Sequence, residues 1–205
     1  MKLKQMAPGE IEKRSFEIIE EELGRELDPV LKPIIKRVIH TTADFSYADT
    51  LYFTPDAVEE GLQALREGVS IVTDTNMGKA GINKKKLEKL GGKVHCFMAE
   101  EDVAAAAFAQ QTTRAAVSMD KAAAMQEDFI FAVGNAPTAL IRLYELIQEK
   151  KIRPRLIIGV PVGFVNVVEA KELIMTAGVP VIVARGRKGG SNVAAAICNA
   201  LIYQL

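Results

Sequence analysis

The chain has 205 residues, a length that fits one domain able to bury a substantial core without disulfide bonds or structural metal ions. Hydrophobic residues make up 49% of it and charged residues 25%, which excludes intrinsic disorder as its main state. Lys plus Arg and Asp plus Glu both number 26, so the chain has no overall positive field and we expect no nucleic-acid partner.

The sequence favours a cytoplasmic protein without a membrane partner. Apolar runs such as "PRLIIGVPVGFV" are too short to cross a bilayer, and the N-terminal residues lack the apolar stretch of a signal peptide. Cys96 and Cys198 lie far apart with no C-x-x-C spacing, so we predict neither a disulfide framework nor a zinc site.

The first 68 residues differ in pattern from the rest of the chain. They predict three helices, over 8–23, 29–40 and 55–67. No linker rich in Ser or Gly follows them, so we predict a single domain over 1–205, in which a helical elaboration (1–68) precedes the core (69–205).

From Val69 onward, short apolar runs rich in β-branched residues alternate with helical segments, as in a parallel sheet covered on both faces. The predicted strands are 69–75, 93–98, 129–135, 155–161 and 180–186. The predicted helices are 83–91, 101–126, 137–150, 167–177 and 191–204. Right-handed crossovers then give an α/β fold, a three-layer α/β/α sheet of five mainly parallel strands, and the flavodoxin-like order 2-1-3-4-5 is our first choice of strand order.

Polar turns follow four of these five strands, with the sequences "TDTNM", "GNAP", "GVPVGF" and "RGRKGGS". In an open parallel sheet, ligands bind beyond the carboxyl ends of the strands. One crevice at this edge could therefore collect all four turns.

The turn "GRKGGS" is the candidate for binding an anion. Gly189 and Gly190 allow close backbone approach, and Ser191 could cap the following helix, whose free N–H groups and dipole attract negative charge. Positive charge is added by Arg185, Arg187 and Lys188. An ordinary strand-to-helix turn remains an equal alternative, and the turn matches neither a P-loop nor a dinucleotide fingerprint.

The chain has two histidines, which excludes a multi-histidine metal site. His95 lies inside a predicted strand, and we interpret it as a packing or surface residue. His40 ends a predicted helix, where it either acts as a cation at the helix terminus or exchanges a proton near neutral pH. Its ring could be oriented by the polar residues that follow, Thr41, Thr42 and Asp44.

Six segments, in their order and spacing, resemble the precorrin-8X methylmutase family from about residue 8 to 202: "IEKRSFEII", "KRVIHTTADF", "TDTNMGKAGI", "GNAPTAL", "GVPVGFVNVVEAKE" and "GRKGGSNVAAAICNAL". The resemblance implies a flavodoxin-like fold and a homodimer with pockets near the subunit interface. It implies an isomerase of cobalamin biosynthesis that moves a methyl group from C-11 to C-12 of (cobalt-)precorrin-8, giving cobyrinate or hydrogenobyrinate. No dissociable cofactor is implied, and any cobalt is carried by the substrate.

The resemblance also assigns residues. His40 of the "VIH" motif becomes the catalytic proton donor, while Ser15, Arg37 and Arg114 fall where the family contacts its substrate. Arginine suits a ligand with several carboxylates, because its planar guanidinium binds them in pairs. We predict further substrate contacts at Thr41, Thr75, Met77, Asn135, Arg187, Gly189 and Gly190, and no protein-bound metal.

Two departures and two alternatives accompany this assignment. Ala170 stands where the family commonly has serine, and "IHTTADF" favours cobalt-precorrin-8 over the metal-free substrate. A corrinoid-binding or carrier protein without turnover is the main alternative, and His40 with its hydroxyl neighbours argues against it. A weaker alternative is a flavodoxin-like module that binds a phosphorylated ligand at "GRKGGS".

Overall fold

The structure, a computed structural model, describes residues 7–205. A mixed sheet of six strands forms its centre. The strands are β1 (Leu51–Phe53), β2 (Ser70–Thr73), β3 (Val94–His95), β4 (Phe129–Val133), β5 (Leu156–Gly159) and β6 (Val181–Ala184). The helices are α1 (Pro8–Leu23), α2 (Lys32–Thr42), α3 (Tyr47–Thr50), α4 (Ala57–Arg66), α5 (Asn76–Gly81), α6 (Lys84–Lys89), α7 (Glu101–Ala109), α8 (Arg114–Ala124), α9 (Pro137–Gln148), α10 (Val167–Met175) and α11 (Ser191–Ile202). Within the described residues, none of them has the length and apolar character that crossing a membrane requires.

The five predicted strands pair in the predicted order. The sheet reads β1-β6-β5-β4-β2-β3, and β2 to β6 correspond to predicted strands 1 to 5. The predicted count of five was wrong, because β1 adds an antiparallel edge strand in which Leu51 pairs with Ala184 and Phe53 with Ile182. Three half-buried residues are too few to show a strand periodicity, so pairing with β6 defines this strand.

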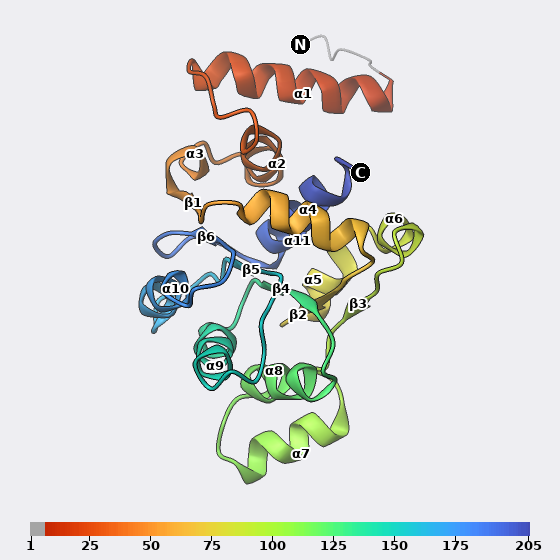
Figure 1. The fold of residues 1–205 in the computed structure, drawn as a ribbon. Helices are drawn as coiled ribbons and strands as arrows, with labels where there is room; N and C mark the ends of the chain where they lie inside the picture. Colours follow the sequence, from red (N-terminus) through yellow and green to blue (C-terminus); the bar gives the residue numbers. More distant parts are fainter. Residues whose placement is uncertain (1–6) are drawn as a thin grey trace.

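Helices cover both faces of the sheet and form the predicted three layers (Figure 1). Along β4, neighbouring side chains point to opposite faces, so Ile130 packs in one core and Phe131 in the other. The first core contains Ile34 of α2 and much of α4 and α11, and the second contains Leu140 of α9 with residues of α7, α8 and α10. All five side chains of β4 are buried, which explains its continuous apolar sequence.

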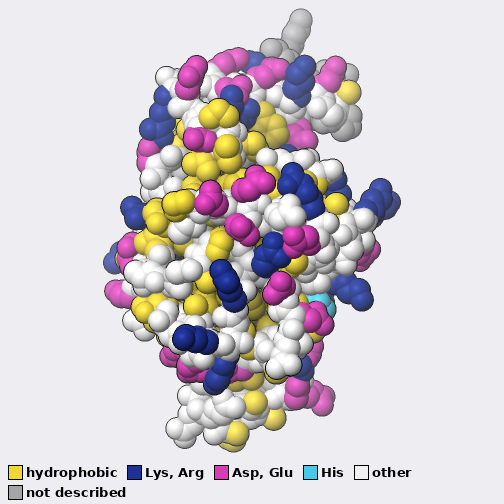
Figure 2. Space-filling model, in the orientation of Figure 1, with side chains coloured by type: hydrophobic (Ala, Val, Ile, Leu, Met, Phe, Trp, Pro, Cys, Tyr) yellow, Lys and Arg dark blue, Asp and Glu magenta, His cyan; other side chains and the backbone are white. Residues whose placement is uncertain are grey.

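Helix α1 lies outside these layers, on the side of α2 away from the sheet (Figure 1). Ion pairs join the two helices, Lys36 Nζ lying 3.0 Å from Glu20 Oε1 and Arg37 pairing with Glu12. Hydrophobic side chains gather below α1 on the face seen in Figure 2, and basic and acidic side chains are interspersed over the rest of that face. The N-terminal elaboration thus adds a helix over α2.

Some predicted helix boundaries were wrong. The Ala-rich segment 101–126 is two helices, because Gln111 adopts a left-handed φ of 52° and Thr113 caps α8 by accepting a hydrogen bond from the Ala116 N–H at 3.2 Å. The interruption "TTR" was visible in the sequence, but the high helix propensity of alanine favoured one helix. Helix α2 extends to Thr42, and the short helices α3 and α5 were not predicted.

Candidate active site

A buried carboxylate organises the carboxyl end of β2. Asp74 is 1% exposed and accepts hydrogen bonds from the backbone N–H groups of Gly134, Asn135 and Ala136 at 2.7–2.8 Å. Burial raises the pKa of Asp74, and the three amides oppose that rise by stabilising the carboxylate. The "GNAP" turn after β4 is therefore held against the end of β2. Asp74 was not among the predicted residues, although a carboxylate directly after a buried strand was a visible signal.

Two predicted substrate contacts, Thr75 and Met77, lie at the start of α5. Thr75 Oγ1 accepts a hydrogen bond from the Gly78 N–H at 2.9 Å and lies 2.7 Å from Ser191 Oγ. The prediction that Ser191 caps α11 was wrong, because Gly190 occupies the N-cap position and Ser191 is the first helical residue. Met77 is 70% exposed, so its apolar side chain is available to a ligand.

Asn135 and Arg114 lie at the same edge, at the side covered by α8 and α9. The side chains of both residues are exposed. Arg114 begins α8 directly after Thr113, whose Oγ1 lies 2.8 Å from Thr138 Oγ1 at the start of α9. The starts of α8 and α9 are thus side by side, and they bring Arg114 to the carboxyl edge near the turn that contains Asn135.

The glycine-rich loop 186–190 between β6 and α11 packs against the loop that follows β5. A Cβ atom on Gly189 would lie 2.1 Å from Val160 O, and the Gly190 N–H donates to the same carbonyl at 2.8 Å. The close approach that Gly189 permits is therefore to the protein's own backbone, and the Gly190 N–H is already bonded. Arg187 is exposed, with its guanidinium carbon 5.6 Å from the centroid of the Phe164 ring.

Helix α10 supplies a buried cation to this loop. Lys171 is 0% exposed, and its Nζ donates to Gly186 O and Lys188 O at 2.8 Å each. Burial lowers the pKa of Lys171 to about 8. We did not predict this residue, because a lone lysine in a helical segment resembles a surface charge. The neighbouring Ala170 is 1% exposed in the core, so the position where we expected a serine lies inside the protein.

His40 lies in the last turn of α2 with an exposed side chain. Its ring centroid is 5.1 Å from that of Phe16 on α1. The prediction that nearby hydroxyls orient the ring was wrong, because Thr41 and Thr42 donate to the carbonyls one turn earlier, at 2.9 and 2.8 Å. The Ser15 hydroxyl makes the same kind of bond within α1, to Ile11 O at 2.8 Å.

Arg37 lies one turn before His40 and is already engaged. It pairs with Glu12, and its guanidinium carbon lies 4.8 Å from the Phe16 ring centroid and 5.1 Å from that of Tyr203. Stacking between two rings restricts the side chain and leaves it 19% exposed. A pocket of about 280 Å³ beside it is lined by Phe16, Lys32, Pro33, Lys36 and Arg37.

An ion pair connects the region of His40 to the glycine-rich loop. Lys188 Nζ lies 2.6 Å from Asp44 Oδ2 and 3.0 Å from Ser46 Oγ, directly beyond the end of α2. The ammonium of Lys188, together with the Ser46 hydroxyl, lowers the pKa of Asp44 to about 2. Asp44 was predicted to orient His40, and it instead fixes the position of α2 relative to the loop.

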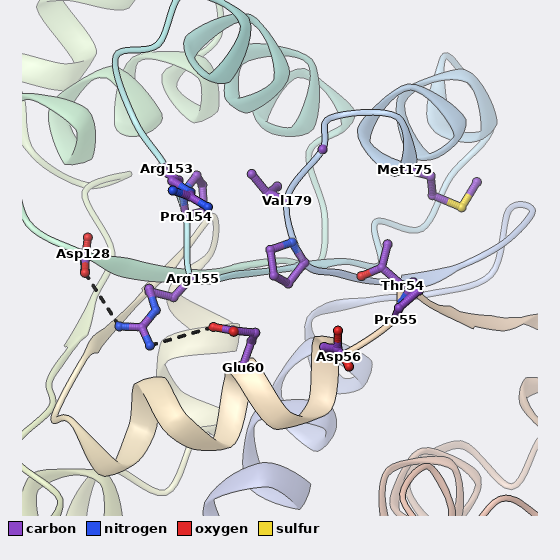
Figure 3. Close-up of a pocket in the computed structure, with 12 residues that line it drawn as sticks. Thr54, Pro55, Asp56, Glu60, Asp128, Arg153, Pro154, Arg155, Met175 and Val179 are labelled. Carbon is purple, nitrogen blue, oxygen red and sulfur yellow. Dashed lines mark ion pairs between the residues drawn. The ribbon is translucent and has the colours of Figure 1, made fainter.

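A pocket of about 700 Å³ opens at the opposite edge of the sheet, by the amino ends of β4, β5 and β6 (Figure 3). Arg155 points between Asp128 and Glu60, whose oxygens lie 3.8 and 3.9 Å from its nitrogens, and it also pairs with Glu67 at 2.5 Å. None of the predicted site residues lines this pocket.

The second histidine packs as predicted. The His95 ring is half-buried, with its centroid 5.9 Å from that of Phe97 and 6.0 Å from that of Phe129, and burial lowers its pKa. Cys96 and Cys198 are both buried and unpaired. Within residues 7–205, no three His, Cys, Asp or Glu side chains gather in a way that could hold a metal ion.

Comparisons with known proteins agree with the resemblance seen in the sequence. The model of the family described as precorrin-8X methylmutase matches residues 10–204. Cobalt-precorrin-8 methylmutase of Priestia megaterium is 45% identical over 95% of this chain and 87% of its own length, and that of Salmonella typhimurium is 45% identical over 97% and 96%. The crystal structure of precorrin-8X methylmutase from Thermus thermophilus superposes with a TM-score of 0.87 at 41% identity, covering 94% of this chain and 96% of that one. The chain therefore belongs to the precorrin-8X methylmutase family of enzymes.

Proposed function

We propose that this protein is an isomerase that moves a methyl group from C-11 to C-12 of precorrin-8, with cobalt-precorrin-8 as its preferred substrate. The observation that carries the proposal is the exposed ring of His40, connected through α2 and Asp44 to a basic loop within a chain that matches the family over residues 10–204. Imidazole exchanges a proton near neutral pH without a large environmental shift.

In this mechanism, an N–H of His40 donates a proton to the ring C nitrogen or to an adjacent position. Protonation makes the conjugated ring more electron-poor, which eases migration of the methyl group to the neighbouring carbon. Because the reaction is an isomerisation, the proton returns to the histidine by the end of turnover and no oxidant or reductant is consumed. General acid catalysis by one positioned side chain typically contributes about 10²–10⁴-fold.

The substrate's acetate and propionate groups need cationic and N–H partners, and the carboxyl edge supplies both. Arg114 and Arg187 are exposed there, and Asn135 projects from the turn that Asp74 holds. A planar guanidinium binds carboxylates in pairs, so we assign the two arginines to carboxylates and Met77 to the apolar ring surface. The remaining contacts proposed are Ser15, Arg37, Thr41, Thr75 and Gly189, whereas Gly190, also predicted as a contact, is buried with its N–H bonded to Val160 O. Arg37 would reach the substrate by exchanging Glu12 for a substrate carboxylate.

We also propose that the enzyme is a homodimer in the cytoplasm and that it needs no dissociable cofactor. Phe164 is 83% exposed and Val165 78%, beside a loop that would bind substrate, and burying them against a second subunit would help enclose a macrocycle. Sedimentation of the wild type at dimer mass, lowered by Phe164→Ser, would support this. Turnover that persists after dialysis against a chelator would support the absence of a cofactor.

Visible absorption spectra test the activity, because moving the methyl group alters ring conjugation. The wild type and the variants His40→Ala and His95→Gln are incubated separately with cobalt-precorrin-8 and with metal-free precorrin-8X. We expect His40→Ala to bind with little change but to convert at least about a hundredfold more slowly, while the matched control His95→Gln converts normally.

Other outcomes have distinct meanings. Near-normal conversion by His40→Ala would remove this residue from the mechanism. Binding of both corrinoids by the wild type, with recovery of each unchanged after long incubation, would contradict the isomerase and favour a carrier. Faster conversion of the metal-free substrate would reverse the proposed preference.

A further inference from the structure

Lys171 is a buried cation without an acidic partner among residues 7–205. Its side chain is 0% exposed, and its ammonium is bound by two backbone carbonyls, those of Gly186 and Lys188. Removing an ammonium from water is costly, and buried charges in proteins are usually paired with an opposite charge. Apolar packing alone would be served by methionine or leucine, so the lysine is explained by what it does to the two carbonyls.

Peptide geometry links these carbonyls to the opposite side of the loop. A trans peptide group is planar and holds its N–H antiparallel to its C=O. With Gly186 O and Lys188 O directed at Lys171, the N–H groups of Arg187 and Gly189 point away from it. The carbonyl between them, Arg187 O, accepts a hydrogen bond from the Gly163 N–H at 3.2 Å. By the same peptide geometry, the Lys188 N–H points away from Gly163.

These amides have no acceptor among residues 7–205. Neither the N–H of Arg187 nor that of Lys188 or Gly189 donates to a protein group there, whereas the next N–H, of Gly190, donates to Val160 O at 2.8 Å. Arg187 and Lys188 are exposed and Gly189 is half-buried, so these free N–H groups are open to a ligand acceptor in place of water. Lys188 is paired with Asp44, so the positive charge left for a ligand beside these amides is that of Arg187, whose guanidinium packs on Phe164.

We propose that Lys171 is a positioning residue that holds the backbone of 186–189 so that the N–H groups of Arg187 and Gly189 receive a carboxylate of the substrate. The proposal rests on the proposed function, because it takes the substrate to be a corrinoid polycarboxylate. Lys171 itself makes no contact with the ligand, and the occupant of the loop is a single acetate or propionate group bound by backbone amides beside Arg187.

Two ligands, one with free carboxylates and one with neutral methyl esters in their place, separate this role from a purely structural one. The variant Lys171→Met keeps the side-chain length and removes the donors, and Lys151→Met removes an exposed lysine at the other edge as a control. Dissociation constants are measured by visible absorption titration with cobyrinate and with its fully methyl-esterified derivative. We expect Lys171→Met to weaken cobyrinate binding on the order of tenfold or more, to leave ester binding unchanged and to spare kcat relative to KM, since amide–carboxylate hydrogen bonds are charge-assisted.

Each alternative result overturns a different statement. Equal weakening of acid and ester would show that Lys171 only maintains the fold, and no change for either would show that it does not position the loop. A wild type that binds neither ligand would overturn the proposed function itself.

A second measurement does not depend on the variant folding. In the wild type labelled with ¹⁵N-glycine, added cobyrinate should shift the amide resonance of Gly189 strongly and that of Gly190 weakly, because the Gly190 N–H is already bonded to Val160 O. A Gly189 resonance that stays fixed while cobyrinate binds elsewhere would refute the proposal.

Discussion

At the carboxyl edge of the sheet, the buried charges of Asp74 and Lys171 bind backbone groups of neighbouring loops, whereas at the amino edge Arg155 pairs with the carboxylates of Glu60 and Glu67. A buried charge that binds backbone groups holds a loop in place and leaves exposed side chains such as Arg187 available to a ligand. A charged side chain that is paired with another side chain is not available to bind a ligand. The larger described pocket, at the amino edge, is therefore a weaker candidate for the site than the edge where backbone groups are organised.

The largest expected effect comes from removing the carboxylate that organises the "GNAP" turn. Asp74→Ala leaves three amides without an acceptor inside the protein, and we expect it to lower the free energy of unfolding by about 3 kcal/mol or more. Urea denaturation measures this, with Asp74→Asn as the isosteric comparison of intermediate effect. A loss below about 1 kcal/mol would mean that water satisfies the turn and that Asp74 does not organise the edge.

A pH titration of stability tests the buried charge of Lys171. Its pKa is about 8 in the folded chain against 10.5 for an unperturbed lysine, so between these values the unfolded chain binds more protons. The free energy of unfolding of the wild type should therefore rise relative to that of Lys171→Met from pH 8 to 10.5, by on the order of 2–3 kcal/mol at most. The two carbonyls favour the ammonium and reduce this gain. If the difference in free energy of unfolding between the wild type and Lys171→Met did not change with pH, the ammonium of Lys171 would not be desolvated.

The ion pair between Lys188 and Asp44 should have a smaller effect, because Lys188 is 59% exposed. A double-mutant cycle with Lys188→Met and Asp44→Asn should give a coupling free energy of about 0.5–1 kcal/mol that falls as salt is added. Since the pKa of Asp44 is lowered to about 2, the coupling should be constant above pH 4 and disappear as the pH falls through about 2. No coupling at low salt would mean that α2 and the loop are positioned independently.

The smallest effect on activity is expected at the amino edge. Arg155→Met should cost about 1 kcal/mol of stability, because its partners are largely exposed, and it should leave kcat/KM unchanged. Reduced turnover with unchanged stability would bring the pocket of Figure 3 into the function and would reverse the comparison between the two edges.

The sequence by itself determined the family and the body of the fold. Strands such as β4 are recognisable because five consecutive buried residues are apolar. Their order was chosen by analogy with flavodoxin-like sheets, because right-handed crossovers limit the handedness of the connections and leave several orders open. His40 and Arg187 were identifiable from local patterns at a helix end and a strand end, whereas Arg114 was assigned by the family resemblance, because the segment around it was predicted as one helix. The family resemblance needed no coordinates, since its motifs are short and continuous.

Only the tertiary structure decided how the edge of the sheet is held together. Strand β1 exists because β6 offers it an edge, and Lys171 matters because its two acceptors lie 15 and 17 residues further along the chain. The same holds for Asp74, whose three donors are 60–62 residues away. A single charged residue in a sequence does not show whether water or a distant backbone group will bind it, because burial depends on every element packed around it.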